Sequence, residues 1–84
     1  MATAEDTPIR TYRELMAALD RRRKQLGLPH LAVDFEAQLQ DGYSGKLFCG
    51  VRNLGPVSFG GLLQALGVEI VLRPRNVENS REAA

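Results

Sequence analysis

The chain has 84 residues, 44% of them hydrophobic, with a formal net charge of +1 and a single cysteine. A chain of this length builds one hydrophobic core and leaves no room for a second domain. The sequence lacks the roughly 20 consecutive apolar residues of a membrane helix, its acidic start predicts no secretory signal, and one cysteine cannot form an internal disulfide, so a cytoplasmic protein without membrane contact is expected.

Residues 1–9 have no apolar periodicity and are predicted to form a flexible arm. Thr11 then begins a helix whose capping box Glu14 completes. Gly27 is expected to end this helix, because glycine adopts a left-handed conformation at little cost. The apolar stripe of the helix consists of Tyr12, Leu15, Met16, Leu19 and Leu26 with the stem of Arg23.

Most of the positive charge lies in this first helix. Residues 9–26 hold six cationic and two acidic side chains, and four consecutive cations occupy residues 21–24. Such a segment suits the binding of a polyanion. A solvated helix end that the helix dipole stabilises explains residues 21–24 equally well, so the charge pattern alone leaves both interpretations open.

Two short helices are predicted next. Pro29 suits the first turn of a helix over about residues 30–38. After a break at residues 40–42, Asp41 is expected to cap a third helix that Gly50 ends. Two short helices joined by a three- to four-residue turn have the arrangement of a helix-turn-helix, whose second helix enters the major groove of DNA. The apolar stripe of the first of these two helices is Leu31, Phe35 and Leu39.

Residues 51–57 are predicted to form a loop, followed by a fourth helix that Ser58 caps and Gly67 ends. Gly60 and Gly61 each weaken this helix by about 1 kcal/mol relative to alanine. Two such glycines suggest that another backbone approaches the helix closely. Its buried face is expected to hold Phe59, Leu62, Leu63 and Leu66.

The last apolar run, residues 68–73, is alternating and β-branched, which predicts a β-strand. The sequence offers no second strand, and an isolated strand leaves a row of backbone donors and acceptors unpaired. Pairing with the same strand of a second copy resolves this, so we expect a homodimer. The polar tail over residues 76–84 is expected to be disordered. The dimerisation residues are Val68, Ile70, Val71 and Leu72.

No constellation of catalytic or metal-binding side chains is visible, so the sequence predicts no enzyme, no cofactor and no metal. His30 and Cys49 are the only residues of their types. Cys49 has apolar neighbours and is interpreted as a buried structural cysteine. Asp34 and Glu36 lie two apart on a helix and do not face each other.

Three segments carry a family resemblance. The first helix ends in Arg21-Arg22-Arg23-Lys24-Gln25-Leu26-Gly27-Leu28, which resembles the lead into the DNA-binding helix pair of lambda-repressor-like, Cro/XRE-family helix-turn-helix regulators. Residues 33–47, most specifically Asp41-Gly42-Tyr43 with Lys46-Leu47, are similar to a proteobacterial subgroup. Residues 65–75 resemble antitoxin-like members whose C-terminal strand pairs across a dimer. The resemblance implies a mainly α domain of four to five helices over residues 10–75 with that one strand.

The resemblance also implies the roles of individual residues. The recognition helix would span about residues 41–49, with His30 near a phosphate and with Arg52 and Asn53 in a loop that contacts the DNA backbone. Under this hypothesis Lys46 and the cluster at residues 21–24, including Arg22 and Arg23, hold phosphates. A core position for Tyr43 and a merely solvated Arg52 remain alternatives. The residues expected to read base edges are Gln40, Tyr43 and Ser44.

One position departs from the family pattern. Where relatives have glycine at the end of the second helix, this chain has Gln38. A left-handed glutamine costs roughly 1 kcal/mol, so we expect an altered turn or a slightly longer helix. The leading hypothesis is a homodimeric, sequence-specific DNA-binding transcriptional regulator. The alternative is an antitoxin-like or degenerate helix-turn-helix protein that mainly binds a protein partner such as a toxin, and Gln38 and the low net charge favour it.

Overall fold

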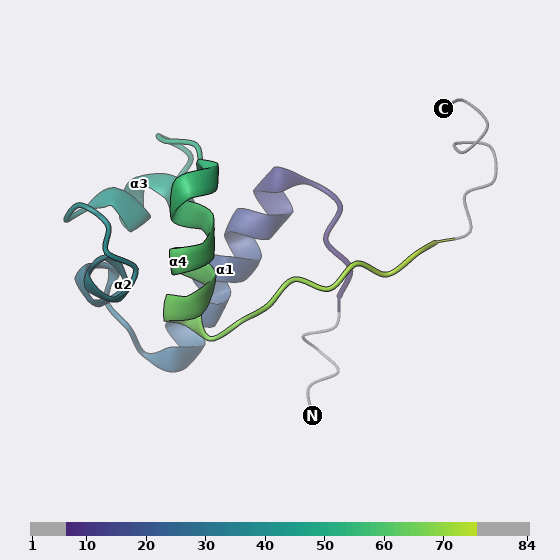
Figure 1. The fold of residues 1–84 in the computed structure, drawn as a ribbon, viewed down its shortest axis with the longest axis horizontal. Helices are drawn as coiled ribbons and strands as arrows, with labels where there is room; N and C mark the ends of the chain where they lie inside the picture. The colour runs from purple at the N-terminus through teal and green to yellow at the C-terminus, as the bar shows by residue number, and fades with distance from the viewer. Residues whose placement is uncertain (1–6, 76–84) are drawn as a thin grey trace.

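The structure is a computed structural model that describes residues 7–75. Four helices follow one another in this range: α1 (Tyr12–Leu26), α2 (His30–Glu36), α3 (Tyr43–Phe48) and α4 (Pro56–Leu66). They gather at one end of the molecule, and residues 68–75 extend away from them (Figure 1). The expectation of a mainly α domain is therefore confirmed. The predicted tail over residues 76–84 and most of the predicted arm lie outside the described residues.

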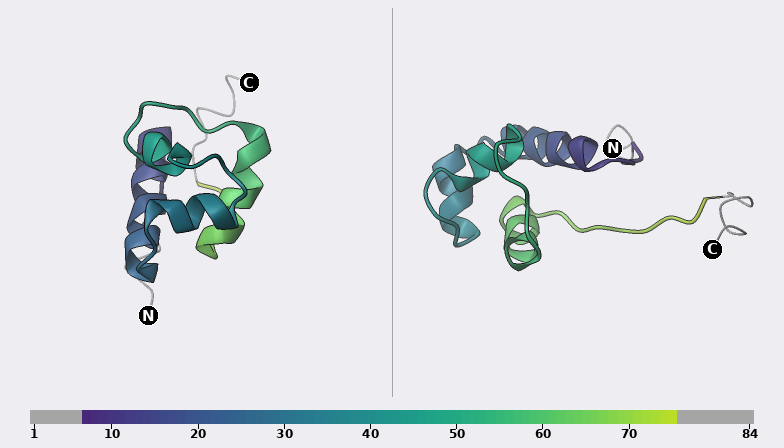
Figure 2. Two further views of the ribbon diagram at one scale, coloured as in Figure 1. Left: turned by 90° about the vertical axis from the view of Figure 1, so that its left-hand side faces the viewer. Right: turned by 90° about the horizontal axis from the view of Figure 1, so that it is seen from above.

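One core joins all four helices. Because α2 and α3 have only seven and six residues, they fall well below the ~12–15 residues at which an isolated helix becomes marginally stable in water. Packing must therefore hold them, and α2 runs across from the side of α1 to the side of α4 (Figure 2, left). No helix in residues 7–75 combines the length and the apolar character needed to cross a bilayer. The buried core residues are Met16, Leu19, Val33, Leu47, Leu62 and Leu66.

The start of α1 agrees with the sequence in outline. The Glu14 N–H donates to Thr11 Oγ1 at 3.0 Å, which confirms the predicted cap. The returning bond of the capping box is displaced by one residue, because the Arg10 N–H donates to Glu14 Oε1. Tyr12 and Leu26, at the two ends of the predicted apolar stripe, are exposed, and only the middle of the stripe is buried.

The start of α4 corrects the sequence prediction. The helix begins at Pro56, with Gly55 preceding it, and not at a cap formed by Ser58. Proline is favoured at this position because its fixed φ is helical and its missing N–H would have no helical partner. Gly61 confirms the expected close approach, since a Cβ there would lie 2.9 Å from the Ala37 carbonyl oxygen, whereas a Cβ at Gly60 would meet nothing within 4 Å.

All four helices of residues 7–75 end in the same way. A residue with a left-handed backbone, with φ between 59° and 90°, closes each of them. Its N–H bonds to the carbonyl three residues before it, and the next N–H bonds to the carbonyl five residues back, at 2.7–3.2 Å. This is the Schellman motif, which satisfies carbonyls that the helix leaves unpaired. The four closing residues are Gly27, Gln38, Gly50 and Gly67.

The buried face of α2 is not the one that its apolar spacing indicated. Leu31 and Phe35 are 59% and 79% exposed, whereas Val33 and Asp34 are fully buried. Leu39 lies beyond the end of the helix and is half-buried. The physical reason is that Asp34 gains hydrogen-bond partners on the inner side, so a carboxylate is buried there at the expense of the larger apolar side chains.

Residues 68–75 form no strand with any other part of residues 7–75. Val68 is half-buried against the core, but Val71 and Leu72 are largely exposed along the extended segment (Figure 1). The strand predicted over residues 68–73 thus has no pairing partner within the described chain. Its pairing with a second copy remains a prediction.

Candidate nucleic-acid interface

The turn between α2 and α3 keeps a tight form although it lacks the expected glycine. Gln38 adopts the left-handed conformation itself, with φ of 59°. The Gln38 N–H donates to the Phe35 carbonyl at 3.2 Å, and the Leu39 N–H donates to the Asp34 carbonyl at 2.7 Å. The expectation of a longer helix is wrong, since α2 ends at Glu36. The tight turn therefore forms with a sterically strained, left-handed glutamine at the position where a glycine was expected.

Asp34 of α2, and not Asp41, caps α3. Its Oδ2 accepts a hydrogen bond from the Gly42 N–H and its Oδ1 accepts one from the Ser44 N–H, both at 2.8 Å. The carboxylate therefore satisfies two of the amides that the start of a helix leaves unpaired. Asp41 is exposed and forms no side-chain cap. The helix that carries the candidate interface is thus held by a side chain of the preceding helix.

Ser44 and His30 form a second link between α2 and α3. Ser44 is fully buried, and its Oγ donates to the His30 carbonyl oxygen at 3.2 Å and lies 3.4 Å from His30 Nδ1. The centroids of the His30 and Phe48 rings lie 6.0 Å apart. A Cβ at Gly45 would lie 3.8 Å from the nearest atoms of the His30 ring. The predicted base contact of Ser44 does not fit this geometry, because its hydroxyl points inward.

The grouping of Ser44, His30 and Asp34 in this region does not have the connections of a catalytic triad. A triad requires the carboxylate to orient the imidazole. Both oxygens of Asp34 instead accept bonds from backbone amides. Within residues 7–75, no group of three or more histidine, cysteine or acidic residues is arranged to hold a metal ion. The cluster is best described as a joint between the two helices.

The outward side of α3 is small and carries one cation. Ser44 and Leu47 are buried, and with 3.6 residues per turn the opposite side holds Gly42, Lys46 and Cys49. All three are exposed. The prediction of a buried structural cysteine is therefore wrong, since Cys49 lies exposed just past the end of the short helix, where its Sγ donates to the Lys46 carbonyl at 3.7 Å.

Two tyrosines hold the loop after α3. Tyr12 Oη of α1 accepts a hydrogen bond from the Leu54 N–H at 2.7 Å, and Tyr43 Oη donates to the Asn53 carbonyl at 3.5 Å. Tyr43 is half-buried against the core, which matches the alternative of a residue that covers the turn region. Arg52 and Asn53 are exposed. The loop thus presents polar side chains from an anchored backbone.

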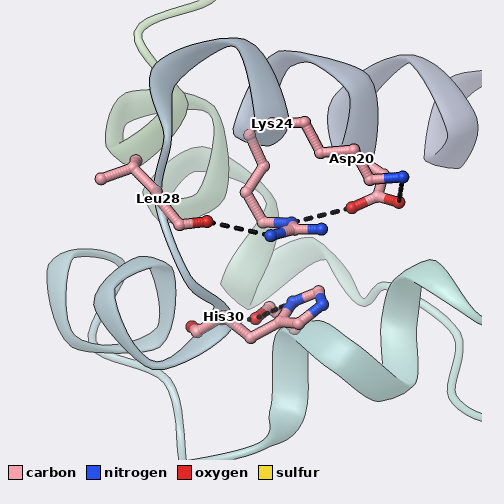
Figure 3. Close-up of polar contacts among 6 residues, drawn as sticks. Asp20, Lys24, Leu28 and His30 are labelled. Carbon is pink, nitrogen blue, oxygen red and sulfur yellow. Dashed lines mark hydrogen bonds and ion pairs between the residues drawn. The ribbon is translucent and has the colours of Figure 1, made fainter.

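The two arginines predicted to hold phosphates make contacts within the chain. Arg22 Nε donates to the Leu66 carbonyl, the last of α4, at 2.9 Å. Arg23 Nη1 donates to the Leu28 carbonyl and its Nε to Asp20 Oδ1, which leaves its side chain only 14% exposed. Figure 3 shows Asp20 of α1 on one side of the Arg23 guanidinium and the carbonyl of Leu28, in the linker between α1 and α2, on the other. Lys24 also approaches Asp20.

The structure therefore divides the predicted site residues into two groups. The residues that are exposed on or beside α3 are Gln40, Lys46, Arg52 and Asn53. The residues that make internal contacts are Arg22, Arg23, His30, Tyr43 and Ser44. The exposed charges among residues 30–53 are two cations and two acids. Attraction to a polyanion is consequently weak there and depends on few contacts. Sequence reasoning missed Asp34, for which the one available signal was an acid amid the apolar residues of a helix that precedes a second helix start.

Comparisons with protein-family models, with curated proteins and with solved structures find no match to this chain.

Proposed function

We propose that this chain binds double-stranded DNA as a homodimeric transcriptional regulator, with α3 as the helix that enters the major groove. Support comes from two short helices joined by a tight turn and locked by buried hydrogen bonds, since rigid presentation of the second helix is what a helix-turn-helix requires. The resemblance of residues 11–75 to Cro/XRE-family regulators points to the same class.

The observation that carries the proposal is the composition of the outward side of α3. Gly42 on this side has no side chain that would keep the helix away from a base pair, and the exposed Lys46 lies at the centre of the side. A helix with so few large side chains approaches a groove closely, and lysine reaches the O6 and N7 acceptors of guanine. The structure shifts the proposed base contacts away from Ser44 and Tyr43 and towards Lys46 and Gln40.

Arg52 and Asn53 supply the proposed backbone contacts. Both lie in the loop that follows α3, which Tyr12 and Tyr43 anchor through the neighbouring backbone. Phosphate contacts from such a loop position a helix on the duplex without reading sequence. Arg52 is the cation for this task, because Arg22 and Arg23 are committed to internal carbonyls.

Dimerisation through residues 68–73 completes the proposal. Backbone groups of an extended segment need partners, and among the described residues no backbone–backbone hydrogen bond joins residues 69–75 to the rest of the chain. Antiparallel pairing of two such segments generates a two-fold axis. Two copies of α3 would then read half-sites about one helical turn apart. Substituting Val71 by a charged residue should leave a folded monomer.

The deciding experiment is binding of the purified chain to a duplex from its own promoter region, at two salt concentrations, against a random-sequence competitor. Specific retention at moderate salt is expected. Lys46 and Arg52 bring two exposed cations per copy, and so four per dimer, close to the duplex. If these cations alone approach it, the slope of log K against log salt should be no steeper than about −4. Equal, weak retention of both duplexes would overturn the proposal.

A second candidate function is binding of a protein partner. The observation in its favour is the exposure of Leu31 and Phe35 on α2, which lie four residues apart on one side of the helix, since contiguous exposed apolar surface marks protein interaction sites. A Phe35→Ser variant separates the two functions. Loss of a co-purifying partner with DNA binding retained would identify Phe35 as a protein contact, and the loss of neither would remove this candidate.

A further inference from the structure

We propose that Asp34 is a positioning residue that fixes α3 relative to α2 and thereby sets how firmly the chain discriminates one DNA sequence from another. The inference about α3 itself rests on contacts within the chain. Its consequence for DNA rests on the proposed function.

Asp34 is connected to both sides of the turn. Its carbonyl accepts the Leu39 N–H at 2.7 Å and so closes the end of α2. Its carboxylate accepts the Gly42 and Ser44 N–H groups at 2.8 Å and so fixes the start of α3. One fully buried residue therefore defines where α2 ends, where α3 begins and which way the first turn of α3 faces.

The short length of α3 makes this anchor decisive. With six residues, the helix has little hydrogen bonding of its own to resist fraying. Leu47 is its one fully buried apolar side chain, and Tyr43 and Phe48 pack against the core only in part, so apolar contacts alone restrict the rotation of the helix weakly. Two charge-assisted bonds from the Gly42 and Ser44 amides to Asp34 restrict that rotation further. The Lys46 N–H donates to the Gly42 carbonyl at 3.3 Å, so the direction of Lys46 depends on how this first turn is held.

The same carboxylate determines where phosphate does not bind. A helix start ordinarily attracts anions, because its unpaired amides and dipole are positive. At α3 the buried carboxylate already occupies the Gly42 and Ser44 amides. Backbone contacts must therefore come from side chains such as Arg52. This distinguishes α3 from a helix that docks its N-terminus on a phosphate.

The test compares Asp34→Asn with a matched control, Glu36→Gln, on the full chain. Both variants remove one negative charge from α2, but Glu36 is exposed and makes none of these bonds. An asparagine offers one acceptor oxygen and turns a donor towards the second amide, so at least one bond is lost. Amide hydrogen exchange is measured without DNA. In parallel, affinity is measured for a duplex from the chain's own promoter region (the selected duplex) and for a random-sequence duplex.

For Asp34→Asn we expect exchange of the Gly42 and Ser44 amides to accelerate about tenfold or more, as for the loss of roughly 1.4 kcal/mol, with the α1 and α4 amides unchanged. The ratio of selected to random affinity should fall about tenfold. Glu36→Gln should alter neither quantity. Asp34→Glu is the substitute if the asparagine variant unfolds. It retains both carboxylate oxygens but moves them out by one methylene group, and the same exchange rates and affinity ratio are measured for it.

Two outcomes would overturn the inference. Equal acceleration throughout α1 and α4 would mean that Asp34 stabilises the whole domain and does not position α3. Local acceleration with an unchanged affinity ratio would mean that the anchor has no part in discrimination between sequences. Absence of specific binding by the unsubstituted chain would instead overturn the proposed function, while the exchange measurement would still decide whether Asp34 holds α3.

Discussion

The cationic end of α1 and the α2–turn–α3 unit place their charges in opposite ways. In α1, four consecutive cations stand at residues 21–24, yet Arg22 and Arg23 are bound to carbonyls at the end of α4 and in the linker. In the α2–turn–α3 unit, a single lysine is exposed and an acid is buried, and the loop after α3 adds a single exposed arginine. The charge of a segment therefore does not measure the charge that it offers to a partner.

The largest expected effect concerns Lys46. Lys46→Ala should lower affinity for the selected duplex by roughly tenfold or more, because a base contact of this kind contributes about 1–3 kcal/mol. Affinity for random duplex should fall less. Arg21→Ala, which removes an exposed cation from α1, is the matched control in a competition titration. An Arg21→Ala loss as large as that of Lys46→Ala would show that the reading surface lies on α1.

The next effect concerns the internal role of Arg23. Arg23→Ala removes the hydrogen bonds to Asp20 and to the Leu28 carbonyl, and hydrogen bonds to a charged group contribute about 1.5–3 kcal/mol each at most. We expect a loss of roughly 2 kcal/mol in the free energy of unfolding, measured by urea denaturation. The slope of DNA affinity against salt should stay the same. A shallower slope with unchanged stability would place Arg23 on the DNA instead.

The close packing of α2 against α4 provides a third test. Gly61→Ala places a methyl group 2.9 Å from the Ala37 carbonyl oxygen, and overpacking of this kind costs about 1–3 kcal/mol. Gly60→Ala meets nothing within 4 Å and should stabilise α4 by about 1 kcal/mol through helix propensity. Thermal unfolding of the pair should therefore shift in opposite directions. Shifts of equal sign would mean that α2 and α4 do not approach as closely as described.

The smallest effect concerns the turn. Gln38→Gly removes the steric strain of a left-handed glutamine, but it also raises the conformational entropy of the unfolded chain. We expect a net gain of about 0.5–1 kcal/mol in the free energy of unfolding. The corresponding change at the end of α1, Gly27→Gln, should destabilise the chain by a similar amount. Both motifs have the same hydrogen bonds. Denaturation of the two variants side by side tests whether they are energetically equivalent.

Several local features were predictable from the sequence. The existence of four helices, the Thr11 cap, the glycines that end α1, α3 and α4, and the close approach at Gly61 all follow from residue type and spacing. Capping side chains and left-handed glycines act within a few residues of where they stand, so a linear pattern contains them. The buried Met16 and Leu19 follow likewise from the periodicity of a long helix.

Other features were decided by contacts between segments. Apolar spacing indicated Leu31 and Phe35 as the buried side of α2, but a helix of seven residues is oriented by its neighbours, and the neighbouring amides of α3 draw Asp34 inward. The same contacts bury Ser44 and move the cap of α3 from Asp41 to Asp34. The exposure of Cys49 also depends on where a six-residue helix stops.

Local residue chemistry sets where this chain bends and where it forms helices, because caps, glycines and prolines impose backbone geometry on their immediate neighbours. Contacts between distant segments set which side of each short helix faces inward and which cations remain exposed. The reason is physical: a helix of six or seven residues has too little stability of its own to set its orientation, so hydrogen bonds between residues eight, ten and fourteen positions apart set it.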